Sequence, residues 1–306
     1  MDHTDESRVR GHAPVMTDEM VAWLEPGPDK CILDCMVGAG GHSRALLEAG
    51  AGRIIGLDRD REALSVAEGT LSSWSRQVEL VHADHREIDD VLDRRGVPTV
   101  DGAIADLGMS SMQIDGEGRG FSFRRDEPLD MRMDRSQGPT VADLLRDVSE
   151  HALADVIFRY GEERYSRRIA RGILDQQIRQ PITTTGELAA LVRRAVPWRG
   201  RPRIDPATRT FQALRVWVNN ELDGLDAFLQ SVCKRLVTGA RFVVIAFHSL
   251  EDRVVKTVFR ELGGKSGDGE SLVRVLTKRP MRPTLDEVSR NPRARSAKLR
   301  AAERVA

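Results

Sequence analysis

Three glycines and an aspartate near the start of the chain have the types and spacing of a nucleoside-binding site. Gly38, Gly40 and Gly41 follow an apolar segment, and Asp58 ends the next one. Glycine allows a tight turn and a close backbone approach to a ligand. A helix that begins after such a turn directs free N–H groups at an anion, and an acid at the tip of the next strand accepts hydrogen bonds from a ribose diol. The pattern predicts a nucleoside-cofactor site at the carboxyl edge of an open parallel sheet.

Two classes of cofactor are compatible with this turn. A dinucleotide site has a third small residue in G-x-G-x-x-G, and that register falls on Ser43. S-adenosylmethionine sites more often read acid-x-G-x-G-x-G. Counted from Asp34, the second and third glycines fall on Gly38 and Gly40, while Met36 replaces the first. S-adenosylmethionine has a carboxylate and no pyrophosphate, so one helix N-terminus suffices for it.

Two further strand-like segments end in polar residues and add to this signal. The segment VELVHADH turns polar at Asp84 and His85, and VDGAIADLG ends at Asp106. In such folds ligands bind at the carboxyl ends of the strands, where the third tip borders the adenine and the fourth faces the methyl acceptor. The alternative is that these residues only cap loops and helices, which explains each of them alone better than all of them together with Asp58.

Composition narrows the class of protein. Lys plus Arg and Asp plus Glu are both 47 of 306 residues, which gives zero net charge. No run approaches the roughly 20 apolar residues of a membrane span, and the N-terminus lacks the apolar core of a signal peptide, so the cytoplasm is the expected compartment. Cys31, Cys35 and Cys233 do not suggest a disulfide framework. The seven histidines have no metal-ligand spacing, and we expect no metal.

Basic residues concentrate in two places. Six arginines and one aspartate lie between Arg193 and Arg209, and eight basic residues lie between Lys278 and Arg300 against two acids. Such clusters can contact several phosphates, although a solvated surface balanced by nearby acids is equally compatible with composition. The candidate RNA-binding residues are Arg193, Arg194, Arg199, Arg201, Arg203, Arg293 and Arg295.

Strand and helix patterns alternate up to Asp106, as a parallel sheet requires. Helical patterns then replace the strands, with capping boxes at Thr140 and Thr184. A long helix follows from about Pro206, a second covers about 225–236, RFVVIAF is a buried strand and SLVRVL an edge strand. We predict a doubly wound α/β fold with an all-helical insert after the fourth strand. Residues 1–111 and 206–306 would form the core, and 112–205 a substrate-recognition domain.

Long strings in this chain resemble one family. They are GGHS (from Gly40), DLGMSSMQID (from Asp106), RGFSFR, PLDMRMD, YGEERYSRRIAR (from Tyr160), PATRTFQALR, FHSLEDRVVK and NPRARSAKLR. The chain resembles the bacterial 16S rRNA (cytosine(1402)-N4)-methyltransferase family from about His12 to Arg304. The resemblance implies a class I methyltransferase fold, S-adenosylmethionine as methyl donor, and as acceptor a decoding-region cytidine of the small ribosomal subunit, within the assembled 30S particle.

The resemblance also implies which residues contact the cofactor. They are Gly40, Gly41, His42, Asp58, His85, Asp106 and Gln113. His85 stands where many members have an aromatic residue, so stacking on the adenine would be weaker or replaced by a hydrogen bond.

A cytosine amine is a poor nucleophile because its lone pair is delocalised into the ring. We hypothesise that Asp106, or a backbone carbonyl beside it, accepts a hydrogen bond from this amine, and that Ser110 and Ser111 hold the cytosine edge. Asp106 serving the cofactor alone is the alternative. His248 invites a general-base interpretation, against a helix cap formed with Ser249.

Three aromatic residues, Phe121, Phe123 and Trp198, lie among arginines and could stack on bases, against buried packing for the two phenylalanines. Rival functions are a methyltransferase for a small molecule or protein, a nonenzymatic nucleotide-binding protein, and a nicotinamide dehydrogenase, which Ser43 disfavours.

Overall fold

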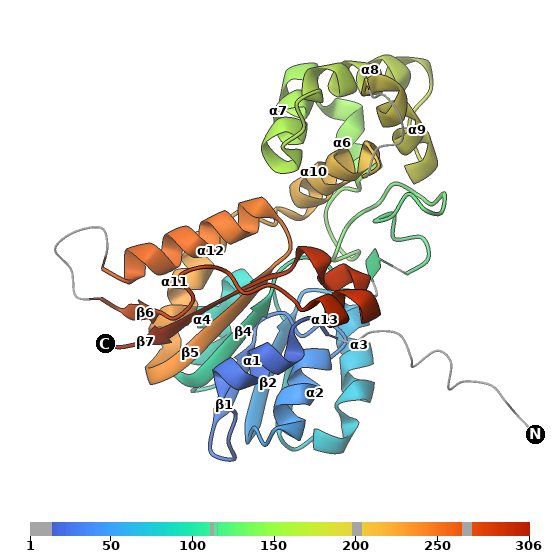
Figure 1. Ribbon diagram of the computed structural model, residues 1–306. Helices are drawn as coiled ribbons and strands as arrows, with labels where there is room; N and C mark the ends of the chain where they lie inside the picture. Colours follow the sequence, from blue (N-terminus) through green and yellow to red (C-terminus); the bar gives the residue numbers. More distant parts are fainter. Residues whose placement is uncertain (1–13, 111–112, 115, 198–203, 265–270) are drawn as a thin grey trace, which may run out of the picture. The chain divides into compact units, whose positions relative to one another are not determined.

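A mixed β-sheet with helices on both faces and a separate group of helices make up the chain (Figure 1). The computed structural model describes residues 14–110, 113–114, 116–197, 204–264 and 271–306. The chain divides into two compact units. The first, Met1–Gly108 with Asp223–Ala306, is called the sheet unit here, and the second, Met109–Leu222, the helical unit.

The described strands of the sheet unit form one seven-stranded sheet in the order β3-β2-β1-β4-β5-β7-β6. Strands β1 to β5 are parallel, and β7 runs antiparallel to both β5 and β6. The order reverses between β1 and β4, which places a ligand crevice at the carboxyl ends of these strands. The expected doubly wound class I fold is confirmed. The strands are β1 (Cys31–Asp34), β2 (Arg53–Asp58), β3 (Val78–His82), β4 (Val100–Asp106), β5 (Leu236–Ala246), β6 (Val273–Val275) and β7 (Lys298–Arg304).

Helices cover both faces of this sheet (Figure 1). The cluster that contains Ile32, Ile54 and Val243 packs against α1, α2 and α3. On the other face Phe242 packs edge-to-face against Phe228 of α11 and Phe259 of α12. Burial on both faces explains why these strands read as continuous apolar runs. The helices are α1 (Thr17–Leu24), α2 (Gly41–Glu48), α3 (Arg61–Thr70), α4 (Ile88–Arg94), α11 (Leu225–Arg235), α12 (Ser249–Leu262) and α13 (Leu285–Arg290).

The helical unit has a core of its own. Leu145, Ile157, Ile169 and Leu188 are fully buried within one cluster. Both expected capping boxes are confirmed, with Thr140 capping α6 and Thr184 capping α9. The helices are α6 (Val141–Asp147), α7 (Glu150–Gly161), α8 (Ser166–Arg179), α9 (Thr185–Ala195) and α10 (Ala207–Asn219).

The structure differs from the expected division slightly at the first boundary, where the helical unit begins at Met109 and not at residue 112, and more at the second. Sequence analysis returned the chain to the core at residue 206, whereas the helical unit extends to Leu222. The physical reason is α10, whose Phe211 and Leu214 are buried in the core of the helical unit. Strand β7 was not expected, and the start of β5 at Leu236 is earlier than RFVVIAF indicated.

Within the described ranges, no helix is both long and apolar enough to cross a membrane.

Candidate active site

The glycine turn between β1 and α2 is shaped by backbone conformation and by packing. Gly38 and Gly40 have φ values of 52° and 85°, in the left-handed region that favours glycine. A Cβ on Gly40 would lie 3.1 Å from Leu71 Cγ, and one on Gly41 would lie 3.2 Å from Pro14 Cβ. Close approach to a ligand was the expected reason for these glycines. The structure adds that neighbouring side chains already fill the space beside Gly40 and Gly41.

Asp34 connects this turn to α2 through hydrogen bonds. It is 1% exposed, and its carboxylate accepts hydrogen bonds from the Ser43 hydroxyl (2.7 Å) and the Met36 N–H (3.3 Å). Helix α2 begins after Gly40, which provides no side-chain cap, and has no acid in its first turn. The first N–H groups of α2 therefore suit an external carboxylate. In the sequence, Asp34 served only as the first residue of the glycine motif, and the pattern did not indicate this positioning role.

Asp58, at the tip of β2, is held by two backbone donors. Gly38 N–H donates to Oδ2 and Asp60 N–H donates to Oδ1, each at 2.8 Å. Burial raises the pKa of Asp58 to about 6, although these two hydrogen bonds oppose the rise. Each carboxylate oxygen keeps a lone pair. Asp58 is therefore oriented, mostly ionised at pH 7, and able to accept hydrogen bonds from a diol.

His85, just past β3, is buried beside Phe228, with ring centroids 4.7 Å apart in an edge-to-face arrangement. Its Nδ1 lies 3.4 Å from Asp84 Oδ1, while Nε2 has no hydrogen-bond partner among the described residues. Burial lowers the pKa of His85 to about 4, so the ring is neutral at pH 7. Since a carboxylate only accepts, Nδ1 carries the proton. The lone pair of Nε2 is then left for a donor such as an adenine amine.

Asp84 caps a turn, which was the alternative interpretation of the polar residues at the strand tips. Its side chain caps a short 3-10 turn, accepting from Arg86 N–H at 3.0 Å. Burial would raise the pKa of Asp84, but hydrogen bonds from Arg86 and the nearby charges lower it to about 2. Asp84 is thus a permanently charged cap.

Asp106, at the tip of β4, is paired with His42 of α2. His42 Nδ1 lies 3.7 Å from Asp106 Oδ2, while His42 Nε2 donates to Val15 O at 2.9 Å. Asp106 Oδ1 has no hydrogen-bond partner in the described part of the chain, and 27% of the side chain is exposed. Burial, with Asp34 and Glu251 nearby, raises the pKa of Asp106 to about 6, against the opposing effect of His42. The carboxylate can therefore exchange a proton near neutral pH.

Ser110 and Gln113 lie in the helical unit and bind each other. Ser110 N–H donates to Gln113 Oε1 at 3.1 Å, and Gln113 N–H donates to Ser110 Oγ at 3.2 Å. This reciprocal pair orders the start of the unit and leaves the Ser110 hydroxyl hydrogen able to donate. Ser111 lies outside the described residues.

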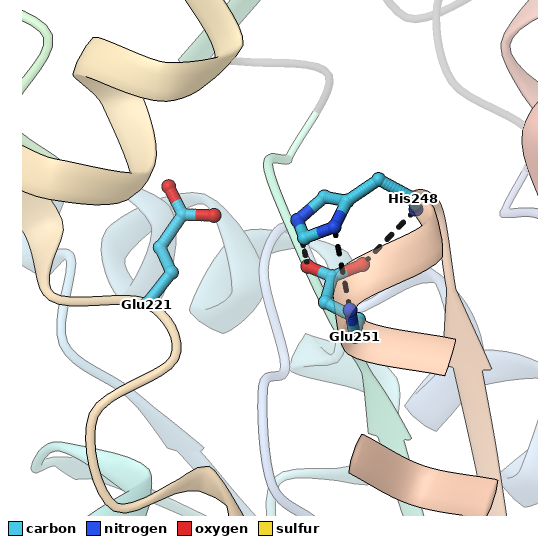
Figure 2. Close-up of side chains that lie close together, drawn as sticks. All are labelled: Glu221, His248 and Glu251. Atoms are coloured by element: carbon cyan, nitrogen blue, oxygen red, sulfur yellow. Dashed lines mark hydrogen bonds and ion pairs between the residues drawn. The ribbon is translucent and has the colours of Figure 1, made fainter. Parts of the chain in front are cut away.

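His248 caps α12, as the alternative to a general base predicted. Figure 2 shows its Nδ1 beside the Glu251 N–H, which donates at 3.3 Å, and Nε2 3.1 Å from Glu251 Oε1. Glu251 Oε2 in turn accepts from the N–H groups of Phe247 and His248, at 2.9 and 3.3 Å. Both ring nitrogens of His248 therefore face Glu251. This arrangement disfavours His248 as a base for substrate.

The expected RNA-binding arginines fall into three groups. Arg193 donates to Asp205 from Nε and Nη2 at 3.0 and 2.9 Å and lies 5.5 Å from the centre of the Phe123 ring, so its charge is already matched. Arg194 and Arg295 are exposed, and Arg293 is half-buried. Arg199, Arg201 and Arg203 lie outside the described residues.

The aromatic candidates divide in the same way. Phe121 is buried, and Phe123 packs edge-to-face on Phe211, with ring centroids 4.8 Å apart. Packing, the alternative for both phenylalanines, is what the structure shows. Trp198 lies outside the described residues.

The residues at the strand tips fit an adenosyl ligand that carries a carboxylate. The turn offers N–H groups, Asp58 offers acceptors at the end of β2, and the unpartnered Nε2 of His85 lies past β3. Asp106, whose side chain is 27% exposed, lies at the next tip, where a reacting group would lie.

Comparison with known proteins agrees with this geometry. The model of the MraW methylase family matches residues 9–305. The chain is 47% identical over 299 residues to a ribosomal RNA small subunit methyltransferase H of Thermotoga neapolitana, covering 96% of each chain. It is also 47% identical over 300 residues to a protein of the same name from Sorangium cellulosum, covering 97% of this chain and 93% of the relative. The chain belongs to the MraW methylase family.

Proposed function

We propose that this protein transfers a methyl group from S-adenosylmethionine to the exocyclic N4 of a cytidine, C1402, in the decoding region of 16S rRNA. The observation that carries the proposal is the near full-length match to relatives named ribosomal RNA small subunit methyltransferase H. Polar residues at the tips of β1 to β4 supply a site of suitable chemistry.

Residues of the sheet unit would hold the donor. The first-turn N–H groups of α2, after Gly40 and Gly41, bind its carboxylate. Asp58 accepts from the ribose hydroxyls, and His85 Nε2 accepts from the adenine amine. His42 and Gln113, which the resemblance places at the cofactor, act more indirectly in this proposal, through Asp106 and Ser110.

When bound, S-adenosylmethionine supplies an electrophilic methyl group on a sulfonium. Asp106 acts at the acceptor: its carboxylate accepts a hydrogen bond from the cytosine amine and takes the proton that the amine releases as the new N–C bond forms and the S–C bond breaks. When His42 is protonated, its charge 3.7 Å from Oδ2 favours the ionised carboxylate that this role requires. Ser110 and Ser111 hold the cytosine edge. Correct placement of the reacting atoms contributes up to roughly 7–11 kcal/mol to lowering such a barrier.

The second role open to Asp106 is contact with the donor alone. The unpartnered Oδ1 is compatible with both roles, because a bond from the donor or from the cytosine amine would satisfy it. The two roles differ in what Asp106→Asn does to donor affinity, which should change only a few-fold if Asp106 acts on the acceptor.

The physiological substrate is proposed to be the assembled 30S subunit, and the reaction to occur in the cytoplasm without a metal ion. The sulfonium needs no Lewis acid to activate its methyl group, and Asp106 suffices as proton acceptor. Enzyme dialysed against a chelator should therefore keep its full rate. Restoration of a lost rate by a divalent ion would contradict the metal-free scheme.

The proposal is tested with small ribosomal subunits that lack this methyl group. Purified protein and isotopically labelled S-adenosylmethionine should transfer one label per subunit, and mass spectrometry of nuclease fragments should place it on N4 of C1402. Naked 16S rRNA run in parallel separates the two forms of substrate. Label on a ribosomal protein or on another nucleotide would overturn the acceptor assignment.

A further inference from the structure

The first half of α8 presents a row of arginines that the proposed reaction does not use. Arg164, Arg167, Arg168 and Arg171 are all exposed and follow one another at positions i, i+3, i+4 and i+7. At 3.6 residues per turn this spacing gathers Arg167, Arg168 and Arg171 on one side of α8, and Arg164 lies just before the helix. Ile169, Ala170 and Ile173 are fully buried on the opposite side. We call these four arginines the α8 stripe.

Most of the stripe is free of carboxylate partners. Arg171 contacts Glu150 at 3.2 Å, and the Arg164 guanidinium lies 4.6 Å from the centre of the Tyr165 ring. Arg167 and Arg168 have no ion pair with any described residue. The contrast with Arg193, which donates to Asp205 from two nitrogens, is clear. The charge of the α8 stripe is available to an outside partner.

Among the described residues, two of the neighbouring acids, Glu163 and Asp175, have no ion pair with the stripe. Glu163 is 5% exposed, accepts from Tyr165 N–H at 2.8 Å and lies 3.9 Å from Arg209. Asp175, four residues after Arg171, is exposed one turn further along α8. The positive field is therefore concentrated at the start of the helix.

Arginines at the start of a helix lower the stability of that helix, so their presence here calls for another explanation. Arg167 and Arg168 lie in the first turn of α8, which has no acid and no side-chain cap. Cations are unfavourable at the positive end of a helix dipole, and Arg167 and Arg171 repel each other at i, i+4. Stability alone would place acids in this first turn.

We propose that the α8 stripe binds the phosphate backbone of the substrate rRNA. This inference rests on the proposed function, because it takes ribosomal RNA as the partner. Arginine matches phosphate with a planar fork of donors, and three or four exposed guanidinium groups in one row can follow successive phosphates. Phe158, 59% exposed on α7, the helix that packs beside α8, adds an exposed aromatic ring to the same helical hairpin.

The test compares two double variants of the full-length protein. Arg167→Gln/Arg168→Gln removes two charges from the stripe, and glutamine has a similar helix propensity. Arg76→Gln/Arg94→Gln is the matched control. Both control arginines are exposed, and they lie before β3 and at the end of α4, at the amino edge of the sheet away from the candidate site. Each double variant changes the net charge by the same amount.

Binding to small subunits and to a naked 16S rRNA transcript is measured over a range of salt concentrations. We expect the stripe variant to lose roughly tenfold to thirtyfold in affinity near physiological salt, with the slope of log K against log salt reduced by about 2. The control should change neither, and Arg167→Lys/Arg168→Lys should keep most of the slope because it keeps the charge. Donor affinity, measured by calorimetry, should be unchanged in every variant.

Two results would overturn the inference. One is equal slopes for the stripe variant and the control. The other is a loss with subunits but not with naked rRNA, which would assign the stripe to a ribosomal protein. Failure of the proposed function looks different: the wild-type protein would then transfer no methyl group to either substrate, while the slopes still report whether the stripe binds RNA.

Discussion

The carboxyl edge of the sheet and the α8 stripe use opposite kinds of side chain in opposite environments. At the sheet edge, Asp34, Asp58 and Asp106 are acids drawn out of water, and burial raises the pKa of the last two to about 6. On α8, Arg167 and Arg168 are exposed without carboxylate partners. A small ligand is selected by buried groups with defined directions, whereas a polyanion is attracted by exposed charge. The two regions should therefore respond differently to pH and to salt.

The largest expected effect is at Asp106. Asp106→Asn keeps the shape but cannot take up the amine proton, so the methyl-transfer rate at saturating donor and subunits should fall by about 10²–10⁴-fold. Donor affinity should change only a few-fold if Asp106 acts on the acceptor. Asp101→Asn, at the other end of β4, is the matched control, because asparagine can still accept from Cys31 N–H there. A normal rate in the Asp106 variant would remove this residue from both proposed roles.

The same substitution should stabilise the fold at high pH. Because the folded-state pKa of Asp106 is about 6, above the unfolded value of 3.8, the carboxyl ionises first in the unfolded chain. The wild-type fold therefore loses stability as the pH rises from about 4 to about 6 and carries the full penalty above that. At pH 8, Asp106→Asn should raise the free energy of unfolding by about 3 kcal/mol. The gain should disappear at pH 4, where the wild-type carboxyl is protonated. Denaturant unfolding at the two pH values checks this, and an equal gain at both would contradict the buried-charge explanation.

Asp58 should make donor binding depend on pH. Its pKa of about 6 means that the carboxyl is ionised at pH 7 and protonated at pH 5, and only the ionised form has full accepting capacity for a ribose diol. The affinity of the wild-type protein should exceed that of Asp58→Asn by about tenfold at pH 7.5, a loss of about one charge-assisted hydrogen bond. Calorimetry should show this ratio shrinking towards one as the pH falls to 5. A ratio independent of pH would exclude Asp58 as the titrating group.

The smallest effect is expected at Arg193. Its substitution compares an arginine that is paired with a carboxylate with the unpaired arginines of the α8 stripe. Its ion pair with Asp205 is partly exposed, so Arg193→Gln should lower the free energy of unfolding by at most about 1 kcal/mol. The salt slope for rRNA should be the same as in the wild type, unlike that of the α8 stripe variant. A fall in slope of about 1 would show that Arg193 exchanges Asp205 for a phosphate.

Much of this organisation is predictable from the sequence. The strands up to β4, the capping boxes and the row of polar strand tips follow from hydrophobic runs and from short-range capping chemistry, which the residues themselves specify. Strand β7 could not be found in this way. Its Lys298 and Arg300 read as part of a basic cluster, but both donate to Asp252 in the structure, and only the fold brings that partner close.

The candidate site was predicted in outline and not in detail. Asp58 and Asp106 follow from their place at strand ends, but the cap formed by His248 and Glu251 depends on side-chain geometry that His248 shares with a general base. The arginine counts favoured the region around Arg193, because counting cannot tell a paired guanidinium from a free one. The α8 stripe was visible as helical spacing in YGEERYSRRIAR, but only the buried face of α8 shows which side is exposed.

Hydrogen exchange tests the division between donor site and RNA surface most directly. With S-adenosylmethionine alone, the amides of residues 36–43 in the glycine turn and those around Asp58 and His85 should exchange more slowly, with α8 unchanged. With 16S rRNA alone, the first turns of α8 should be protected. Protection of α8 by the donor without any change in the glycine turn, or RNA protection confined to the surface around Arg76 and Arg94, would contradict the assignment.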